Sequence, residues 1–104
     1  MLATSLGKFH LCPGEQQLLY DGNPVPLTNK AFETLQILVS NNGHLVEKSE
    51  IMSAVWKDSF IEEGNLAVTI AMIRKALGDT HKHSKYIQTV VKRGYRFTAP
   101  ARLC

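Results

Sequence analysis

The chain has 104 residues, 44% of them hydrophobic, and a net charge of +3 with histidine neutral. This length and composition predict one globular domain with a modest core. No apolar run approaches the roughly 20 residues that a helix needs to cross a bilayer. The first residues also lack the basic start and apolar stretch of a signal peptide.

The two cysteines, Cys12 and Cys104, lie near opposite ends of the chain. Two cysteines do not make a disulfide framework, and this spacing is not that of a metal site. We therefore expect a reducing, cytoplasmic location, with Cys12 as a small buried residue and Cys104 at a frayed, exposed end. A parent protein anchored in the membrane by a segment outside this sequence is compatible with that location.

The charges are distributed unevenly along the chain. The net charge is −1 over residues 1–29, −3 over residues 30–64 and +7 over residues 65–104. A basic third on an otherwise acidic body is the footprint expected of a binding site for a polyanion. The alternative is chance clustering on a solvated surface.

The first 28 residues are predicted to form short strands joined by turns. Candidate strands cover residues 8–11, 17–20 and 25–27. Asp21-Gly22-Asn23 is a strong hairpin signal, because Gly and Asn tolerate a positive φ. The third strand is expected at an edge of the sheet, since Pro26 cannot donate to a strand ladder.

Two helices are predicted next. The first follows Thr28, a good N-cap, and ends at Asn41-Asn42-Gly43, where glycine suits a left-handed cap. The second covers residues 48–56 and follows a candidate short strand at Leu45-Val46. Apolar residues recur in both helices at helical spacing and are expected to be buried: Phe32, Leu35, Leu38, Val39, Ile51, Met52, Val55 and Trp56.

After a polar, acidic loop over residues 57–64, a third helix is predicted over residues 65–77. Asn65 is its expected N-cap and Gly78 its C′ residue. One face is a continuous apolar stripe for the core: Leu66, Ile70, Ile73 and Leu77. The remaining positions are small, partly apolar, and basic at the C-terminal end: Ala67, Val68, Thr69, Ala71, Met72, Arg74 and Lys75. Such a face can approach a duplex closely, and its methyl groups can contact thymine methyls in the major groove.

A hairpin is predicted to finish the domain. Residues 86–90 and 94–98 are rich in strand-forming residues. Lys92 and Arg93 lie in the turn between them, and Arg96 lies on the second strand. A basic arm of this kind can reach phosphates or a minor groove.

The element order and several blocks of sequence resemble the C-terminal DNA-binding domains of OmpR/PhoB-type transcriptional regulators and the related ToxR/CadC-type one-component regulators. The resemblance extends over about residues 7–99. The matching blocks are LTNKAFETL at residues 27–35, VW at 55–56, IRKALG at 73–78, IQTV at 87–90 and RGYRF at 93–97.

This resemblance implies an α+β winged helix-turn-helix over residues 1–104, in which residues 7–28 form an N-terminal antiparallel sheet, 29–78 a three-helix core and 86–98 the hairpin called the wing. It implies sequence-specific binding to double-stranded DNA, with the helix over residues 65–77 in the major groove and residues 91–97 on phosphates or in the minor groove. Binding as tandem copies on direct repeats is also implied, as is a parent protein of the response-regulator kind in a phosphorelay.

The resemblance further implies that the loop over residues 57–64 contacts RNA polymerase, through Asp58, Phe60, Glu62 and Glu63. Protein–protein interaction through this loop is the alternative function. We expect no enzyme activity, cofactor, metal or small-molecule substrate, because no catalytic constellation is visible and His81-x-His83 reads as part of a charged connector.

Four positions depart from the family pattern. Ala31 stands where relatives often have the Glu of a capping box, and Glu47 stands where they start the second helix with Ser or Thr. Ala71 and Met72 stand where they often have two arginines, which read guanine for roughly 1–3 kcal/mol each. We therefore expect weaker or more A·T-tolerant base readout, with more of the affinity supplied by the wing.

The residues expected to contact DNA lie on the third helix or the hairpin and are expected to be exposed: Val68, Thr69, Met72, Arg74, Lys75, Lys92, Arg93 and Arg96. Alternatives stay open for several of them. Met72 can fill a gap in the core, Arg74 and Lys75 can act only on the helix dipole, and the hairpin cations can be solvated strand charges.

Overall fold

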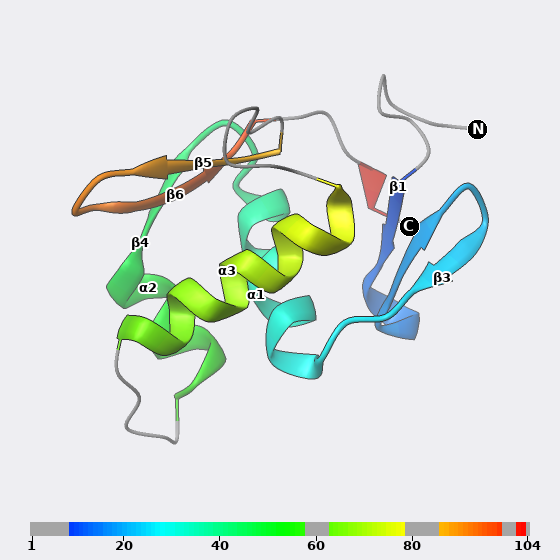
Figure 1. The fold of residues 1–104 in the computed structure, drawn as a ribbon, viewed down its shortest axis with the longest axis horizontal. Helices are drawn as coiled ribbons and strands as arrows, with labels where there is room; N and C mark the ends of the chain where they lie inside the picture. Colours follow the sequence, from blue (N-terminus) through cyan, green and yellow to red (C-terminus); the bar gives the residue numbers. More distant parts are fainter. Residues whose placement is uncertain (1–8, 58–62, 79–85, 99–101, 104) are drawn as a thin grey trace.

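The structure, a computed structural model, describes residues 9–57, 63–78, 86–98 and 102–103. Three helices separate two small sheets, and the sheets lie at opposite ends of the molecule (Figure 1). This is the α+β winged-helix arrangement that the sequence predicts.

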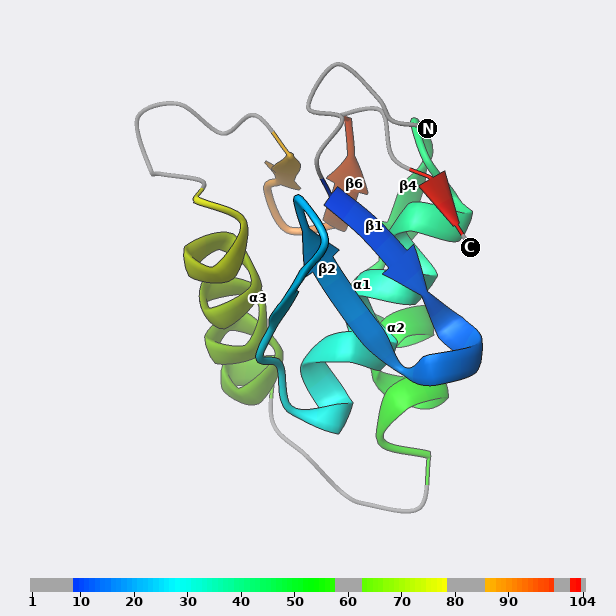
Figure 2. The same cartoon turned by 90° about the vertical axis from the view of Figure 1, so that its right-hand side faces the viewer.

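The N-terminal sheet has the strand order β3-β2-β1-β7. Its first three strands, β1 (Phe9–Cys12), β2 (Gln17–Tyr20) and β3 (Asn23–Val25), pair antiparallel. Asp21 and Gly22 both have positive φ, 51° and 85°, as a two-residue hairpin turn requires. Figure 2 shows this sheet lying across α1.

The second sheet contains the wing. The central strand β6 (Gly94–Phe97) pairs antiparallel with both β4 (Leu45–Glu47) and β5 (Ile87–Val90). The β5–β6 hairpin is the wing, and β5 is its edge strand. The hairpin projects past the N-terminal half of α3 (Figure 1).

The helices are α1 (Asn29–Ser40), α2 (Lys48–Val55) and α3 (Glu63–Leu77). The hydroxyl of Thr28 accepts a hydrogen bond from the backbone N–H of Ala31 at 3.1 Å, which confirms the predicted N-cap of α1. Gly43 and Gly78 follow α1 and α3 with φ of 85° and 76°, the left-handed conformation that glycine adopts at low cost.

One hydrophobic core joins the helices to both sheets. The predicted stripe of α3 is fully buried, as are the predicted apolar residues of α1. In α2, Ile51 and Val55 are buried and Met52 is partly buried, while Trp56, directly after the helix, is 8% exposed. Tyr95 and Phe97 pack against the same core from the wing.

Four details differ from the expectations. Strand β3 covers Asn23–Val25 instead of residues 25–27, because the tight turn at Asp21 and Gly22 returns the chain at once and Pro26 lies beyond the strand. Helix α3 begins at Glu63 rather than after an Asn65 N-cap. The short strand β7 (Arg102–Leu103) pairs parallel with β1, which no sequence pattern indicated. Cys12 is buried as expected but disulfide-bonded, and Cys104 lies outside the described residues.

Candidate nucleic-acid interface

The exposed face of α3 carries six side chains: Asn65, Ala67, Val68, Ala71, Met72 and Lys75. Val68 is 60% exposed and Met72 39%, which is unusual for large apolar side chains on a helix that already buries a full stripe. Met72 therefore lies on the exposed face of α3 and outside the core cluster. Small Ala67 and Ala71 leave room for another surface to approach the helix backbone.

Thr69 does not belong to this face, so its prediction as an exposed reading residue is wrong. Its side chain is 7% exposed, and its hydroxyl donates to the carbonyl oxygen of Asn65 at 2.9 Å. The sequence held the signal: Thr69 stands three residues after Leu66 and four before Ile73, a spacing that places it with the buried stripe.

The tip of the wing is defined here as Val91, Lys92 and Arg93. Val91 is 76% exposed, and the other two side chains are exposed as well. The backbone N–H of Arg93 donates to the carbonyl oxygen of Val90 at 2.9 Å, and Lys92 takes a positive φ of 66° to close the turn. The wing therefore presents two cations and one bare apolar side chain at its end.

Arg96 lies on the other face of the wing sheet. Thr89 and Tyr95 are cross-strand partners and share the face that looks toward α3, because the hydroxyl of Thr89 accepts from Arg74 of that helix. Side chains alternate along a strand, so Arg96 points away from α3. There its Nη1 donates to Oε1 of Gln88 at 3.0 Å. The sequence predicted that Arg96 contacts DNA together with Lys92 and Arg93, whereas the structure places it on the face of the wing turned away from α3.

Arg74 and Lys75 share the last turn of α3 but are placed differently. Lys75 is exposed, whereas Arg74 is only partly exposed and turns toward the wing. Its Nη2 donates to the carbonyl oxygen of Ile87 at 2.9 Å and to the hydroxyl of Thr89 at 2.8 Å.

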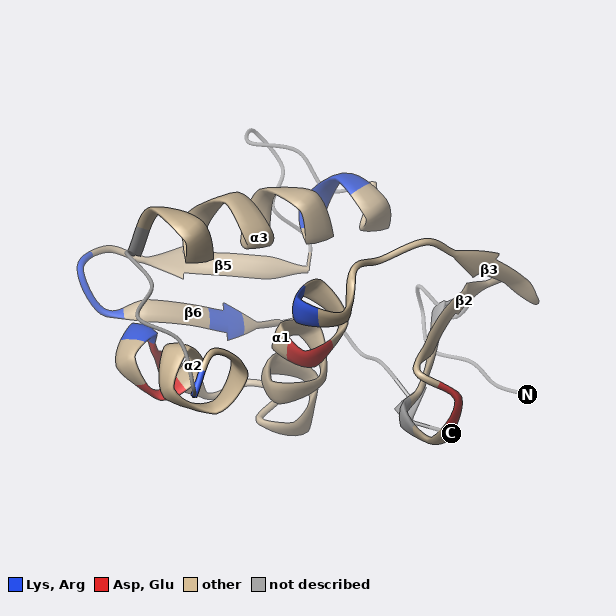
Figure 3. Cartoon of the chain, turned by 90° about the horizontal axis from the view of Figure 1, so that it is seen from below, with Lys and Arg blue, Asp and Glu red and all other residues tan. Residues whose placement is uncertain are grey.

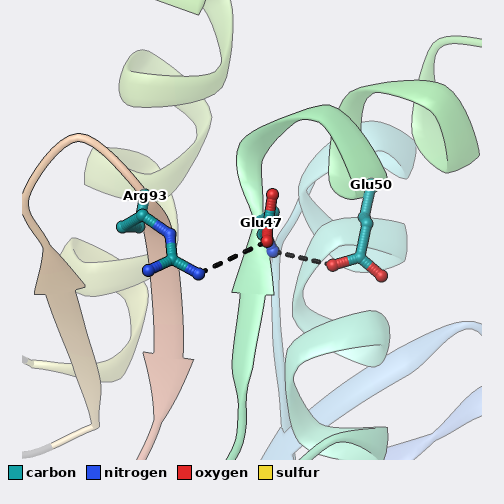
Figure 4. A network of polar contacts seen from close by, with 3 residues as sticks. All are labelled: Glu47, Glu50 and Arg93. Atoms are coloured by element: carbon teal, nitrogen blue, oxygen red, sulfur yellow. Dashed lines mark hydrogen bonds and ion pairs between the residues drawn. The ribbon is translucent and has the colours of Figure 1, made fainter.

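A small polar network joins the wing tip to the start of α2 (Figure 4). Nη2 of Arg93 lies 3.4 Å from Oε2 of Glu47. The Arg93 side chain is 59% exposed and that of Glu47 is 50% exposed. The backbone N–H of Glu47 donates to Oε1 of Glu50 at 3.0 Å, and that of Lys48 donates to the carbonyl oxygen of Arg93 at 3.1 Å. An acidic residue at the N-cap thus takes the place of the family's Ser or Thr and is also the partner of a wing cation.

At Gly94 the backbone of β6 lies close against that of β4. A Cβ atom at this position would overlap the carbonyl oxygen of Val46 and lie 2.9 Å from the Cα of Glu47. Glycine in the RGYRF block therefore serves packing, because its φ is not in the left-handed region.

Basic residues occupy both ends of this surface. Figure 3 shows them at the β5–β6 turn and in the last turn of α3, and residues 64–73 of α3 carry no charge. Acidic residues lie on α1, on α2 and at Glu47 just before it, and in the N-terminal part of the chain (Figure 3), and Glu63 is the first residue of α3. The described residues therefore show an apolar strip between two positive ends, and of the cations in the +7 segment only Lys82 and Lys85 lie outside them.

The predicted polymerase-contact loop is largely outside the described residues, since Asp58, Phe60 and Glu62 are not among them. Its last two residues, Glu63 and Gly64, form the first turn of α3 instead of loop. His81 and His83 also lie outside. No helix among the described residues has the length and apolar character to span a membrane.

Comparison with known proteins identifies the family. Residues 22–97 match the family model described as "Transcriptional regulatory protein, C terminal". The chain belongs to this family. Its members are the OmpR/PhoB-type winged-helix domains of transcriptional regulators, which bind DNA and are not enzymes.

Two curated members of the family share much of this sequence. "Transcriptional regulatory protein KdpE" of Mycobacterium tuberculosis (strain CDC 1551 / Oshkosh) is 34% identical over 85 residues, which are 81% of this chain and 38% of KdpE. "Transcriptional activator CadC" of Escherichia coli (strain K12) is 28% identical over 96 residues, 91% of this chain and 19% of CadC. The chain thus spans less than half the length of either relative.

Solved structures of the family share the fold. The DNA-binding domain of Escherichia coli CadC superimposes with a TM-score of 0.78 at 27% identity, covering 96% of this chain and 94% of that one. The Klebsiella pneumoniae RstA DNA-binding domain, crystallised in complex with the RstA box, gives a TM-score of 0.79 at 24% identity and covers 90% of this chain and 94% of RstA's.

Proposed function

We propose that this chain binds double-stranded DNA sequence-specifically for a bacterial-type transcriptional regulator, with α3 in the major groove and the wing tip on phosphates or in the minor groove. One observation carries the proposal. Of the four exposed large hydrophobic side chains among the described residues, Val68 and Met72 lie on α3 and Val91 lies at the wing tip. Cations flank this apolar strip at both ends.

The side chains divide the work by their chemistry. Val68 and Met72 have no hydrogen-bonding groups that could read guanine, so they discriminate through contact with thymine methyls. Lys75, Lys92 and Arg93 neutralise phosphates, which supplies affinity without sequence information. Arg96, on the outer face of the wing sheet, contributes less than the tip.

Selection of bound sequences from a random DNA pool tests this proposal. The selected site is expected to contain an A·T-rich core and to bind at least about tenfold more tightly than a scrambled duplex. Neutralising about four to six phosphates predicts a slope near −4 to −5 when log K is plotted against log salt concentration. Flat affinity between low and moderate salt, or no enrichment in the pool, would overturn the proposal.

Further parts of the proposal concern the parent protein. We infer tandem binding on direct repeats and a receiver domain elsewhere in the parent. We also infer cytoplasmic location, from the family alone, because the disulfide-bonded Cys12 removes the argument from reduced cysteines. Family membership and the coverage of 38% of KdpE support them. Two half-sites at a constant spacing in the selected sequences are expected; single half-sites only would contradict tandem binding.

A contact with RNA polymerase is the second candidate function. A groove of about 510 Å³ lies between α1 and the end of α2, directly before the predicted contact loop. Its lining mixes charged and apolar groups, among them Lys30, Glu33, Ile37 and Trp56. Binding of purified polymerase subunits to the DNA-bound domain, and its loss in Glu33→Ala, would support this contact; binding unchanged in that variant would exclude the groove.

A further inference from the structure

Arg74 connects α3 to β5, the edge strand of the wing. It lies in the last turn of α3, and β5 belongs to a hairpin 13–15 residues further along the chain. One nitrogen, Nη2, donates both to the carbonyl oxygen of Ile87 and to the hydroxyl of Thr89. Because β5 is an edge strand, these bonds hold the side of the hairpin that no further strand supports.

The Arg74 side chain lies against the protein instead of extending into solvent. Its Nε atom is buried and has no hydrogen-bond partner among the described residues. Lys75, its neighbour, is exposed in the same helical turn. Two adjacent cations that look equivalent in the sequence therefore have different surroundings.

We propose that Arg74 is a positioning residue, which fixes the wing against α3 so that the wing tip and the exposed face of α3 meet one duplex together. The inference rests on the proposed DNA docking. It replaces the prediction that Arg74 neutralises a phosphate, because Nη2 of the guanidinium is held by two acceptors on β5 and Nε is buried.

The planar guanidinium is suited to this role. Its donors are held in a rigid fork, so a bridge between two fixed acceptors costs little rotamer freedom per bond. Lysine keeps the charge and binds phosphate as a point charge, but its flexible ammonium does not reproduce that fork. A positional role and a phosphate contact therefore predict opposite results for Arg74→Lys.

The experiment measures affinity for the selected DNA site at one moderate salt concentration. A positional role predicts that Arg74→Lys and Arg74→Gln both weaken binding about tenfold, a loss typical of a disrupted interaction network. A phosphate contact predicts that Arg74→Lys stays within about twofold of the original chain. The second result would overturn the inference.

A double-mutant cycle between Arg74 and Lys92 of the wing tip measures the coupling between their effects on DNA affinity. A general loss of stability would not change this coupling. In the original chain, Lys92→Ala is expected to weaken binding about threefold or more. In the Arg74→Lys background the same substitution is expected to weaken binding less than about twofold, because the wing is then already misplaced. The matched control is Lys75→Gln, which is expected to weaken binding by the same factor in the original chain and in the Arg74→Lys background. Additive effects of Arg74→Lys and Lys92→Ala would contradict the inference.

Thr89→Val removes one acceptor while leaving Arg74 and all charges in place. It is expected to weaken binding, and to have little further effect on top of Arg74→Lys, because both act through the same contact. This variant keeps the test valid even where an Arg74 substitution lowers the melting temperature below that of the assay. Tighter binding or unchanged binding in Thr89→Val would refute the role of this bond. If the original chain binds no DNA, the proposed function fails; if it binds and the cycles are additive, only this inference fails.

Discussion

Gly94→Ala tests how the wing is seated on the rest of the domain. The added Cβ would overlap the carbonyl oxygen of Val46, so β4 and β6 must move apart where Glu47 faces Gly94. Overpacking costs about 1–3 kcal/mol, and each backbone hydrogen bond lost with the separation costs about 1 kcal/mol more. The bond from the N–H of Lys48 to the carbonyl oxygen of Arg93 is among those at risk. We therefore expect a loss of about 3 kcal/mol in the free energy of unfolding.

A thermal melt followed by circular dichroism measures this loss. For a domain of this size about 3 kcal/mol corresponds to a drop in Tm of roughly 10–25 °C. The matched control is Gly64→Ala in the first turn of α3, where a Cβ meets nothing within 4 Å and φ is not positive. That control is expected to gain about 0.5–1 kcal/mol through a less flexible unfolded chain. A Gly94→Ala domain that melts within about 2 °C of the original would refute the argument from close approach.

Three further predictions concern single side chains at the interface. Thr69→Val is expected to keep the Kd for the selected site within about twofold, because the hydroxyl bonds inside α3; a tenfold loss in fluorescence anisotropy titrations would return Thr69 to the DNA surface. Glu47→Gln is expected to tighten binding by about two- to fivefold at low salt, because Glu47 is an exposed partner of Arg93 and competes with phosphate for it. Weaker binding in this variant would show that Glu47 does not compete with phosphate. Arg96→Ala is expected to weaken binding less than Lys92→Ala in the same titration, because Arg96 lies on the face turned away from α3; the reverse order would place that outer face on the DNA.

Most of the fold follows from local patterns in the sequence. The apolar stripe of α3 predicts its buried face, and the positive φ of Gly43 and Gly78 matches their predicted positions as caps. The tight turn at Asp21 and Gly22 was predicted by the same reasoning. These features depend on residues close together along the chain, where spacing and backbone preference decide the outcome.

The roles of the arginines depend on residues far apart along the chain. Arg74 finds its acceptors on β5, and Arg93 finds Glu47 46 residues earlier. No local pattern predicts which cation is turned inward by such pairings. Arg96 is a partial exception, because alternation with the buried Tyr95 and Phe97 would have placed it on the outer face. The parallel pairing of β7 needs only backbone groups and leaves no signature in side chains.

Footprinting of the domain on its selected site tests the central claim most directly. Methylation protection at guanine N7 reports the major groove at G·C pairs, and replacement of single thymines by uracil, which removes the C5 methyl group, reports it at A·T pairs. Hydroxyl-radical cleavage reports the backbone and minor groove. With α3 and the wing tip on one duplex, we expect a protected major-groove block of about 3–5 base pairs. A backbone or minor-groove patch is expected to flank this block on the wing side and to fade in Lys92→Ala. A footprint without major-groove protection, or one that Lys92→Ala leaves unchanged, would contradict the account.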